Sequence, residues 1–404
     1  MQSIRNRLIL RDNSSKYRAR IDIVLILLVY AMTIFGVFAV SVASFNINSN
    51  PEADIFNQIV GSHYGLRQAI FMLISPIVLG FIVAIPYDYI RNNVMIIYFL
   101  SIGLLLVALL GEAVAGINAF ISIFWGLTIQ PAEFAKIAII VLLASQLENL
   151  NDPFKTVKSS IKFLITVGAP ALITIMQGEM GSAIVMAAIV LVMLFVAGMP
   201  WKRFLLLIAF AGMAMVGIVL FWSLFNPESY RLQRIIALVN PDAASEAAKY
   251  QVNNSMIAVG TGGLKGIGPF KEGSIAQLDY VPKDWTDFIF STIGEAFGFV
   301  GCVAVIVLYI LIIFRLMYLA RTSLNRFSEL VIIGIMTLIL VHVFLNIGMT
   351  IGLVPVVGIP LPFLSYGGSN LFTNMIGIGL VLNVTKNRKL SKTKYDSSYI
   401  EKHL

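Results

Sequence analysis

Charged residues are scarce in this sequence. Asp, Glu, Lys and Arg make up 12% of its 404 residues, whereas 58% of the residues are hydrophobic. Soluble domains carry about twice that charged fraction. A mean hydropathy of +0.87 agrees with the low charge. The composition therefore excludes an ordinary soluble domain and predicts an all-α integral membrane protein.

Cysteine and histidine are also rare. Cys302 is the single cysteine, which excludes an intrachain disulfide. The three histidines, His63, His342 and His403, are far apart and form no zinc-binding pattern. The residues therefore predict no metal site and require no cofactor. His342 lies in an apolar run, where a packing role and a functional role explain it equally well.

A cleavable leader is not expected either. The first 20 residues, "MQSIRNRLILRDNSSKYRAR", are basic and too polar to contain the apolar core of a signal peptide. The first long apolar run begins at Ile21 and is long enough to span a membrane. We expect this run to serve as its own signal anchor.

Long apolar runs are what the sequence has in quantity. A spanning helix needs roughly 20 apolar residues. This length predicts about ten transmembrane helices, at residues 22–44, 67–88, 94–113, 133–149, 161–177, 181–199, 203–224, 286–314, 328–353 and 361–384. The fourth has the weakest pattern, because Glu133, Lys136 and Glu148 interrupt it.

The basic residues predict how these helices cross the membrane. With the N-terminus inside, 21 of the 29 Lys and Arg residues fall on the cytoplasmic side. Cytoplasmic loops collect such residues, so both termini are predicted to be cytoplasmic. The chain then divides into a basic segment (1–21), a single membrane domain (22–384) and a basic tail (385–404). Both basic ends can contact anionic lipid in the bilayer, and the net charge of +8 needs no nucleic-acid partner.

One connection differs from the rest. Residues 225–285, between the seventh and eighth predicted helices, form a long polar loop on the extracytoplasmic side. Loops this long are usually functional or disordered. Two amphipathic pieces, Arg231–Val239 and Gln251–Val259, predict short helices on the membrane surface.

Some ionisable residues interrupt the apolar runs. Each costs a few kcal/mol inside a membrane and therefore needs a reason. Glu133 and Lys136 are three residues apart, so they share one helix face and can pair. Two interpretations are open: a buried ion pair that fixes helix packing, or a pair that lines a polar cavity.

Asp287 and Glu295 form a second acidic pattern. Eight residues of helix turn through ~800°, which places the two acids within about 80° of each other. They can therefore share one cavity wall. The alternative for Asp287 is a helix cap, because the start of a helix favours an acid.

The stretch "GTGGLKGIG", Gly260–Gly268, is rich in glycine but is not a nucleotide-binding loop, because Lys265 stands where the third glycine should be. A tight surface loop is the simplest interpretation. Backbone amides that line a pyrophosphate are the alternative.

The stretch "GLVPVVGIPLPFLSYGGSN", Gly352–Asn370, breaks the ninth and tenth predicted helices. Irregular backbone at membrane depth occurs only where protein or a water-filled cavity surrounds it. We therefore expect a cavity wall. The side chains that can satisfy its freed backbone groups are Ser365, Tyr366, Ser369 and Asn370.

Four stretches, in this order, resemble the SEDS family (shape, elongation, division and sporulation), typified by RodA, FtsW and SpoVE. They are "IQPAEFAKIA" (129–138), "AVGTGGLKGIG" (258–268), "TDFIFSTIGEAFGFVG" (286–301) and "NIGMTIGLVPVVGIPLPFLSYGGSN" (346–370). The resemblance covers nearly the whole chain from residue 22. It implies a fold of ten spans with both ends inside.

The resemblance also implies an activity. SEDS proteins are peptidoglycan glycosyltransferases that polymerise lipid II, the undecaprenyl-pyrophosphate-linked disaccharide-pentapeptide. They act at the outer face of the bacterial cytoplasmic membrane, beside a class B penicillin-binding protein, in elongation, division or sporulation.

The resemblance further implies a site. Asp287 matches the essential acid of the family, which implies that it acts on the acceptor sugar as a general base or by positioning it. Lys265, Lys271, Arg231 and Arg234 are expected to hold the pyrophosphate, and a divalent cation is compatible with that role. The residues expected to bind substrate or line the cavity are Glu133, Lys136, Lys265, Glu295, Ser365, Tyr366, Ser369 and Asn370. Asp284, also in the loop, is expected to be dispensable.

The sequence departs from the family pattern near this site. Lys283 and Trp285 stand where the family has Glu and His, and Ala296 replaces a Glu. "QGEMGSA" (177–183) replaces "QPDLGTA", and the Arg-Trp pair before Gln130 is missing. Two other classes therefore stay open: a transporter of lipid-linked precursor, and a non-catalytic scaffold that activates a penicillin-binding protein.

Overall fold

The structure is a computed structural model that describes residues 21–44, 55–111, 118–122, 128–148, 156–225, 246–323 and 325–386. Most of the predicted basic segment 1–21, nearly all of the tail 385–404 and the predicted helix Arg231–Val239 lie outside these described residues. The cations Arg231 and Arg234 lie outside them as well.

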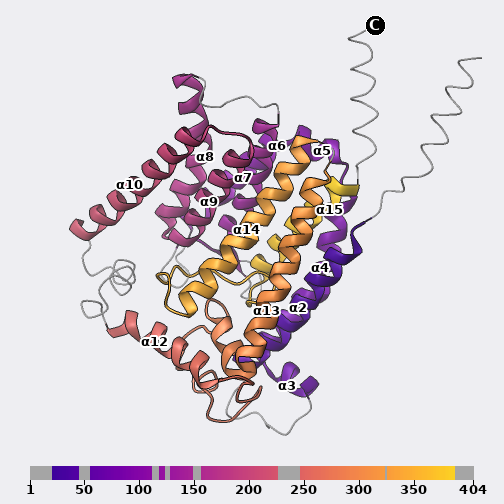
Figure 1. Cartoon of the computed structure of the whole chain (residues 1–404), viewed down its shortest axis with the longest axis vertical. Coiled ribbons are helices and arrows are strands. Elements are labelled where there is room, and N and C mark those ends of the chain that lie inside the picture. Colours follow the sequence, from indigo (N-terminus) through magenta and orange to yellow (C-terminus); the bar gives the residue numbers. More distant parts are fainter. Residues whose placement is uncertain are drawn as a thin grey trace, which may run out of the picture.

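The described residues are mostly helical (Figure 1). The helices are α2 (Ile23–Ala43), α3 (Ile55–Gly61), α4 (His63–Ala84), α5 (Tyr87–Asn92), α6 (Val94–Leu110), α7 (Pro131–Leu147), α8 (Val157–Gln177), α9 (Met180–Val196), α10 (Trp201–Phe225), α12 (Glu246–Thr261), α13 (Ile289–Arg321), α14 (Arg326–Thr350) and α15 (Gly368–Lys386). Two short strands, β1 (Ile121–Ser122) and β2 (Thr128–Ile129), pair antiparallel with Ile121 opposite Ile129.

Each of the ten predicted spans overlaps one of these helices. Among the described residues, five helices are long and apolar enough to cross a membrane: α2, α4, α8, α13 and α14. α6 and α9 are shorter apolar helices. The chain is therefore a multi-pass membrane protein, and the count of ten spans stays a prediction.

The tenth predicted span starts too early. Residues 361–384 were expected to be helical, but α15 begins at Gly368. Pro360 and Pro362 lack the backbone N–H that a helix needs, and Phe363 has a positive φ of 65°. Residues 351–367 therefore form an irregular connection between α14 and α15, called here the broken segment.

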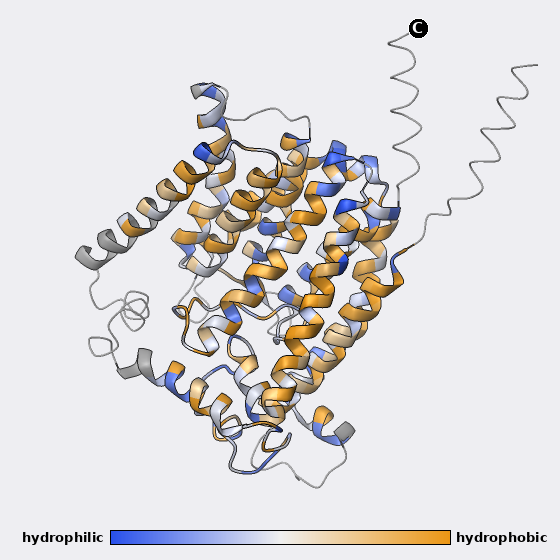
Figure 2. Cartoon of the chain, viewed as in Figure 1, coloured by the Kyte–Doolittle hydropathy of each residue, from blue (hydrophilic) through white to orange (hydrophobic). Residues whose placement is uncertain are grey.

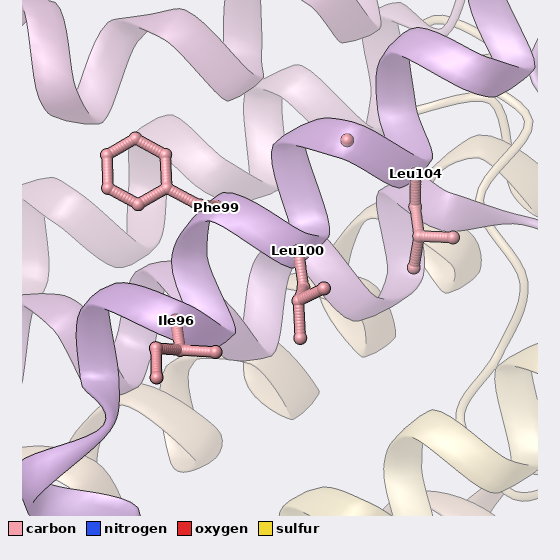
Figure 3. Close-up of a pocket in the computed structure, with 5 residues that line it drawn as sticks. Ile96, Phe99, Leu100 and Leu104 are labelled. Atoms are coloured by element: carbon pink, nitrogen blue, oxygen red, sulfur yellow. The ribbon is translucent and has the colours of Figure 1, made fainter.

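The bundle has two central helices and an apolar outer surface. Almost every residue of α7 is buried, and α14 is buried along most of its first half. Hydrophobic residues cover the outer helices along their length (Figure 2). On α6, Ile96, Phe99, Leu100 and Leu104 project outward and line a shallow apolar pocket with Gly103 (Figure 3). Exposed apolar faces of this kind suit contact with lipid.

The helix ends lie in two layers, one at each end of the bundle, and polar contacts join the helix ends of one layer. At one end, Arg315 of α13 pairs with Asp22 at the start of α2, with a shortest N–O distance of 2.6 Å. At the same end, Asn325 before α14 contacts Tyr87 of α5, and Asn383 of α15 donates to the carbonyl of Ile85. α3 and α12 lie at the opposite end of the bundle (Figure 1).

The first and last described helices thus begin and end in the same layer. This arrangement suits an even number of crossings. The predicted cytoplasmic cations Arg91, Lys202, Arg315 and Arg326 belong to that layer, whereas Lys265 and Lys271 follow α12. Which layer faces the cytoplasm stays a prediction from the positive-inside rule.

The predicted helix Gln251–Val259 is confirmed as part of α12. The glycine-rich stretch that follows it packs on α13. α13 is kinked at Gly298 (φ 64°, ψ −161°), and a Cβ on Gly298 would lie 2.3 Å from the backbone nitrogen of Gly266. Glycine is required there because two backbones are in contact.

Several backbone amides of this stretch are used inside the protein. Those of Ile267 and Gly268 donate to the carbonyls of Glu295 and Ala296 (2.9 and 3.1 Å). They are therefore not available to line a pyrophosphate, and the interpretation as a tight loop accounts for the glycines.

The orientation can be tested with two exposed lysines, Lys271 and Lys202, one in each layer. We expect Lys271→Cys to react with a membrane-impermeant maleimide in intact cells, and Lys202→Cys to react only after permeabilisation. The native Cys302 is buried, so its background is low. Labelling of Lys202→Cys alone in intact cells would reverse the predicted orientation.

Candidate active site

Asp287 lies in a turn that leads from the long loop into α13. Residues 281–288, called here the Asp287 turn, are irregular, and α13 begins at Ile289. The N-cap residue is Phe288, whose side chain makes no capping hydrogen bond. Asp287 therefore stands one residue before the N-cap position that the cap interpretation gave it. Its side chain is half-buried.

Four consecutive residues of this turn each accept a hydrogen bond from another segment. The donors and acceptors are Thr292 Oγ1 to Asp284 Oδ2 (3.0 Å), Tyr366 N to Trp285 O (2.9 Å), Ser365 Oγ to Thr286 O (2.6 Å) and Asn346 Nδ2 to Asp287 O (2.7 Å). The donors come from α13, the broken segment and α14. The position of Asp287 is therefore fixed from several sides, as a preorganised site requires.

The broken segment is held by side chains of α14 and α4. The Asn346 amide also donates to Ile359 O (2.7 Å), and His342 Nδ1 lies 3.1 Å from Pro360 O. Gln68 of α4 donates to the carbonyl of Ser365 and accepts from the amide of Gly367 (3.3 and 3.2 Å). These groups replace the helical hydrogen bonds that the segment lacks.

Ser365 fills the role that the sequence suggested for it, because its hydroxyl accepts from Leu361 N at 2.7 Å. Gln68, His342 and Asn346 were not assigned this role. They were missed because they lie on helices far from the segment in the sequence.

Aromatic rings pack beside the Asp287 turn. Trp285 stacks on Tyr64 of α4 with ring centroids 4.7 Å apart, and Tyr366 meets Tyr64 edge-on at 4.9 Å. Stacked and edge-on pairs of this kind stabilise a contact beyond the area that they bury. Trp285, a departure from the family pattern, therefore joins α4 to the turn and to the broken segment.

Glu133 and Lys136 form the predicted ion pair. Lys136 Nζ lies 2.7 Å from Glu133 Oε1, and the two side chains are 1% and 2% exposed. His342 Nε2 lies 3.0 Å from the same ammonium. Because an ammonium only donates, Nε2 accepts, which leaves the ring proton on Nδ1 to reach the Pro360 carbonyl. The pair is confirmed, and His342 extends it to the broken segment.

Glu179 is an acid that the sequence analysis did not assign to the site. It precedes α9, in the stretch "QGEMGSA". It accepts hydrogen bonds from the Gln130 side chain and from Ser182 Oγ (3.3 Å). Burial raises the pKa of Glu179 to about 7. The charge of Glu133 also raises this pKa, whereas the hydrogen bond from Gln130 and the charge of Lys136 lower it.

Ser369, in the first turn of α15, links the stretch before α7 to the helix that follows the broken segment. It accepts from the backbone amide of Gln130 (3.3 Å) and donates to Thr128 O (3.1 Å). Ser369 was predicted to satisfy freed backbone groups near the broken segment, and it bonds instead to the backbone of Thr128 and Gln130.

The structure gives other surroundings to three predicted residues. The Glu295 carboxylate accepts from the backbone amides of Ile275 and Ala276 (2.6 and 3.1 Å), so it holds the long loop. Asn370 accepts from Asn374 within α15. Lys265 is exposed on the glycine-rich stretch.

Asp284 differs from the expected loop acid. Its side chain is buried, with an exposure of 1%. Within the described ranges, no three His, Cys, Asp or Glu side chains form a group that could hold a metal ion. A divalent cation stays a prediction.

Comparisons with known proteins show the family to which this chain is similar. A family model described as "Cell cycle protein", FTSW_RODA_SPOVE, matches residues 22–390. The chain is 32% identical over 379 residues to the probable peptidoglycan glycosyltransferase FtsW of Trichlorobacter lovleyi, covering 92% of this chain and 95% of that one. It is 35% identical over 261 residues to the peptidoglycan glycosyltransferase MrdB of Escherichia coli K12, covering 65% and 69%.

Solved structures share the fold. One, described as "Structural coordination of polymerization and crosslinking by a peptidoglycan synthase complex", matches with a TM-score of 0.71 and 25% identity. A mutant of the rod shape determining protein RodA from Thermus thermophilus matches with a TM-score of 0.63 and 25% identity. Each covers 91% of this chain and 98% of the other.

The ion pair generates a stability prediction. Glu133→Gln keeps the shape of the side chain but leaves the buried Lys136 ammonium without a countercharge, which costs ~3–5 kcal/mol of unfolding free energy. We expect a lower folded yield and a lower Tm. Exchanging the two residues should recover part of the loss.

Glu148→Gln is the matched control on α7. Glu148 pairs with Arg91 (2.8 Å), but that pair is partly exposed, so its loss costs about 1 kcal/mol or less. Equal Tm values for Glu133→Gln and the parent would show that the buried pair does not matter for folding.

Glu179 generates a pH prediction. Its folded pKa of about 7 lies above the ordinary 4.5, so the folded protein holds this proton more tightly than the unfolded chain does. The free energy of unfolding should therefore fall by at most about 3 kcal/mol as the pH rises between these two values. Glu179→Gln should remove this fall, and Glu329→Gln, in a partly exposed pair, should keep it. Tm measured from pH 5 to 8 checks this, and identical slopes for Glu179→Gln and the parent would contradict it.

Proposed function

This chain belongs to the FtsW, RodA and SpoVE family, and we propose that it polymerises lipid II at the end of the bundle that carries the Asp287 turn. It is a peptidoglycan glycosyltransferase. The proposal places the reaction at the outer face of the bacterial cytoplasmic membrane, where the lipid tail of the substrate can stay in the bilayer.

The observation that carries the proposal is the row of four hydrogen bonds on residues 284–287. They hold Asp287 where a bound acceptor sugar could meet it. In the transfer, the acceptor 4-OH attacks the anomeric carbon of the donor, a new glycosidic bond forms, and the bond to the lipid pyrophosphate breaks. Asp287 takes the proton of the hydroxyl or orients it, a contribution of ~10²–10⁴-fold for a general base.

The leaving pyrophosphate needs positive charge. Lys265 and Lys271 are exposed in the long loop that leads into the Asp287 turn. We assign this role to them together with Arg231 and Arg234 of the same loop, with or without a divalent cation. Cationic groups that face a developing phosphate charge stabilise the transition state.

The second part of the site is the group around Glu133 and Lys136. His342 joins this pair to Pro360, and Asn346, one turn further along α14, contacts the backbone of Asp287. We propose that this polar group forms the wall of the substrate site, as the resemblance implied. The buried pair would then have both roles that the sequence left open: it fixes helix packing and it lines a polar cavity.

A partner is proposed from one of the solved relatives, which was studied in a complex that polymerizes and crosslinks peptidoglycan. A class B penicillin-binding protein is the crosslinking enzyme proposed for this chain. Relatives named as glycosyltransferases favour an enzyme over a transporter or a scaffold. They include both FtsW and MrdB, so the proposal covers elongation, division and sporulation alike.

The test is Asp287→Asn. Asparagine keeps the size of the side chain and the backbone carbonyl that Asn346 binds, so folding should be preserved. Formation of glycan chains from labelled lipid II should fall at least ~10²-fold, because the base is lost. The assay uses the purified full-length chain with its penicillin-binding partner.

Glu272→Gln is the control, since Glu272 is an exposed acid of the same loop and should be neutral to activity. Undiminished chain formation by Asp287→Asn would remove Asp287 from the mechanism. Movement of lipid II across vesicles without chains would favour a transporter, and neither activity would favour a scaffold.

A further inference from the structure

Asp284 is a buried acid three residues before Asp287, and its charge state has no part in the mechanism above. Its Oδ2 accepts the hydroxyl of Thr292, which lies in the first turn of α13, at 3.0 Å. In the part of the chain that the structure describes, its Oδ1 is buried and has no hydrogen-bond partner. An ionised carboxylate in such a place is costly, because a buried charge needs several partners.

The charges that act on Asp284 are unfavourable to its ionised form. Burial raises the pKa of Asp284 well above its ordinary value. The acids Asp279 and Glu295 add to this effect, while the Thr292 hydroxyl and the backbone of Trp285 oppose it. Burial therefore favours the uncharged form of Asp284.

The hydrogen bond to Thr292 differs from the other three in the row. Trp285, Thr286 and Asp287 are held through backbone carbonyls, which do not titrate. Asp284 is held through its side chain, by a donor on α13. Its hydrogen bond is the one in the row whose acceptor can change charge.

We propose that Asp284 is a positioning residue for glycosyl transfer, whose uncharged carboxyl ties the Asp287 turn to α13 through Thr292 and whose ionisation loosens that turn. The inference rests on the proposed role of Asp287. When Asp284 ionises, a buried charge with one unpartnered oxygen faces two other acids. The turn relieves this by moving out toward water, which displaces Asp287 from the acceptor.

Four variants test the proposal by kcat, KM and pH profile with labelled lipid II. Asp284→Asn imitates the uncharged acid, so it should match the parent at low pH and keep its activity as the pH rises through the range in which the parent loses it. Asp284→Leu lacks the acceptor and should lower kcat by ~10–100-fold at every pH with little change in KM, because a small misplacement of a reacting group is costly.

Thr292 provides the matched pair on the other side of the bond. Thr292→Val removes the hydroxyl and should lower kcat as Asp284→Leu does, whereas Thr292→Ser keeps the hydroxyl and should restore it. If Asp284→Leu does not fold, Thr292→Val tests the same bond. An alkaline loss in Asp284→Asn equal to that of the parent, or full kcat in Thr292→Val, overturns the proposal.

A second readout separates this proposal from the proposed function. Because the folded pKa of Asp284 is raised, the parent should lose more thermal stability than Asp284→Asn as pH rises, while the loss that Glu179 causes is common to both. Tm against pH needs no activity. If the Tm gap between variant and parent grows with pH but neither forms glycan chains, Asp284 is a buried uncharged acid and the proposed enzymatic function is wrong. If the two Tm curves stay parallel, the proposal that Asp284 is a buried uncharged acid is wrong.

Discussion

The site depends on one constraint: the broken segment 351–367 has few helical hydrogen bonds, yet its second half is buried among membrane helices. Polar groups in that environment must be satisfied by protein or by enclosed water. Here Asn346 and His342 from α14 and Gln68 from α4 supply the bonds. Ser365 and Tyr366 of the same segment donate hydrogen bonds to the turn that carries Asp287. The bonds that satisfy the broken segment therefore also hold it beside this acid.

α14 connects the two polar groups of the site. His342 and Asn346 are four residues apart and therefore share one face of the helix. His342 accepts from the buried Lys136, and Asn346 donates to the carbonyl of Asp287. One face of α14 thus joins the ion pair on α7 to the acid before α13. These three parts of the site are far apart in the sequence.

Local sequence patterns account for much of this structure. Hydropathy places the helices, and the spacing of Glu133 and Lys136 predicts their pairing. The patterns fail where a residue's partner is remote. Glu295 turns to the amides of the long loop, and Asp284 is buried against Thr292. Gln68 binds a segment about three hundred residues away. Periodicity along one helix fixes a face, but it does not say which distant backbone will meet that face.

The contact between the glycine-rich stretch and α13 has a further consequence, because at its glycines main chain lies directly against main chain. A Cβ on Gly262 would lie 1.9 Å from Gly294 O, and one on Gly266 would lie 2.2 Å from Ala296 O. At these glycines there is no side chain that a substitution could enlarge, shorten or recharge, so the contact cannot be adjusted in small steps. Divergence among descendants of this chain should spare these glycines and accumulate in the exposed residues between them, such as Leu264 and Lys265, whose side chains leave the contact untouched.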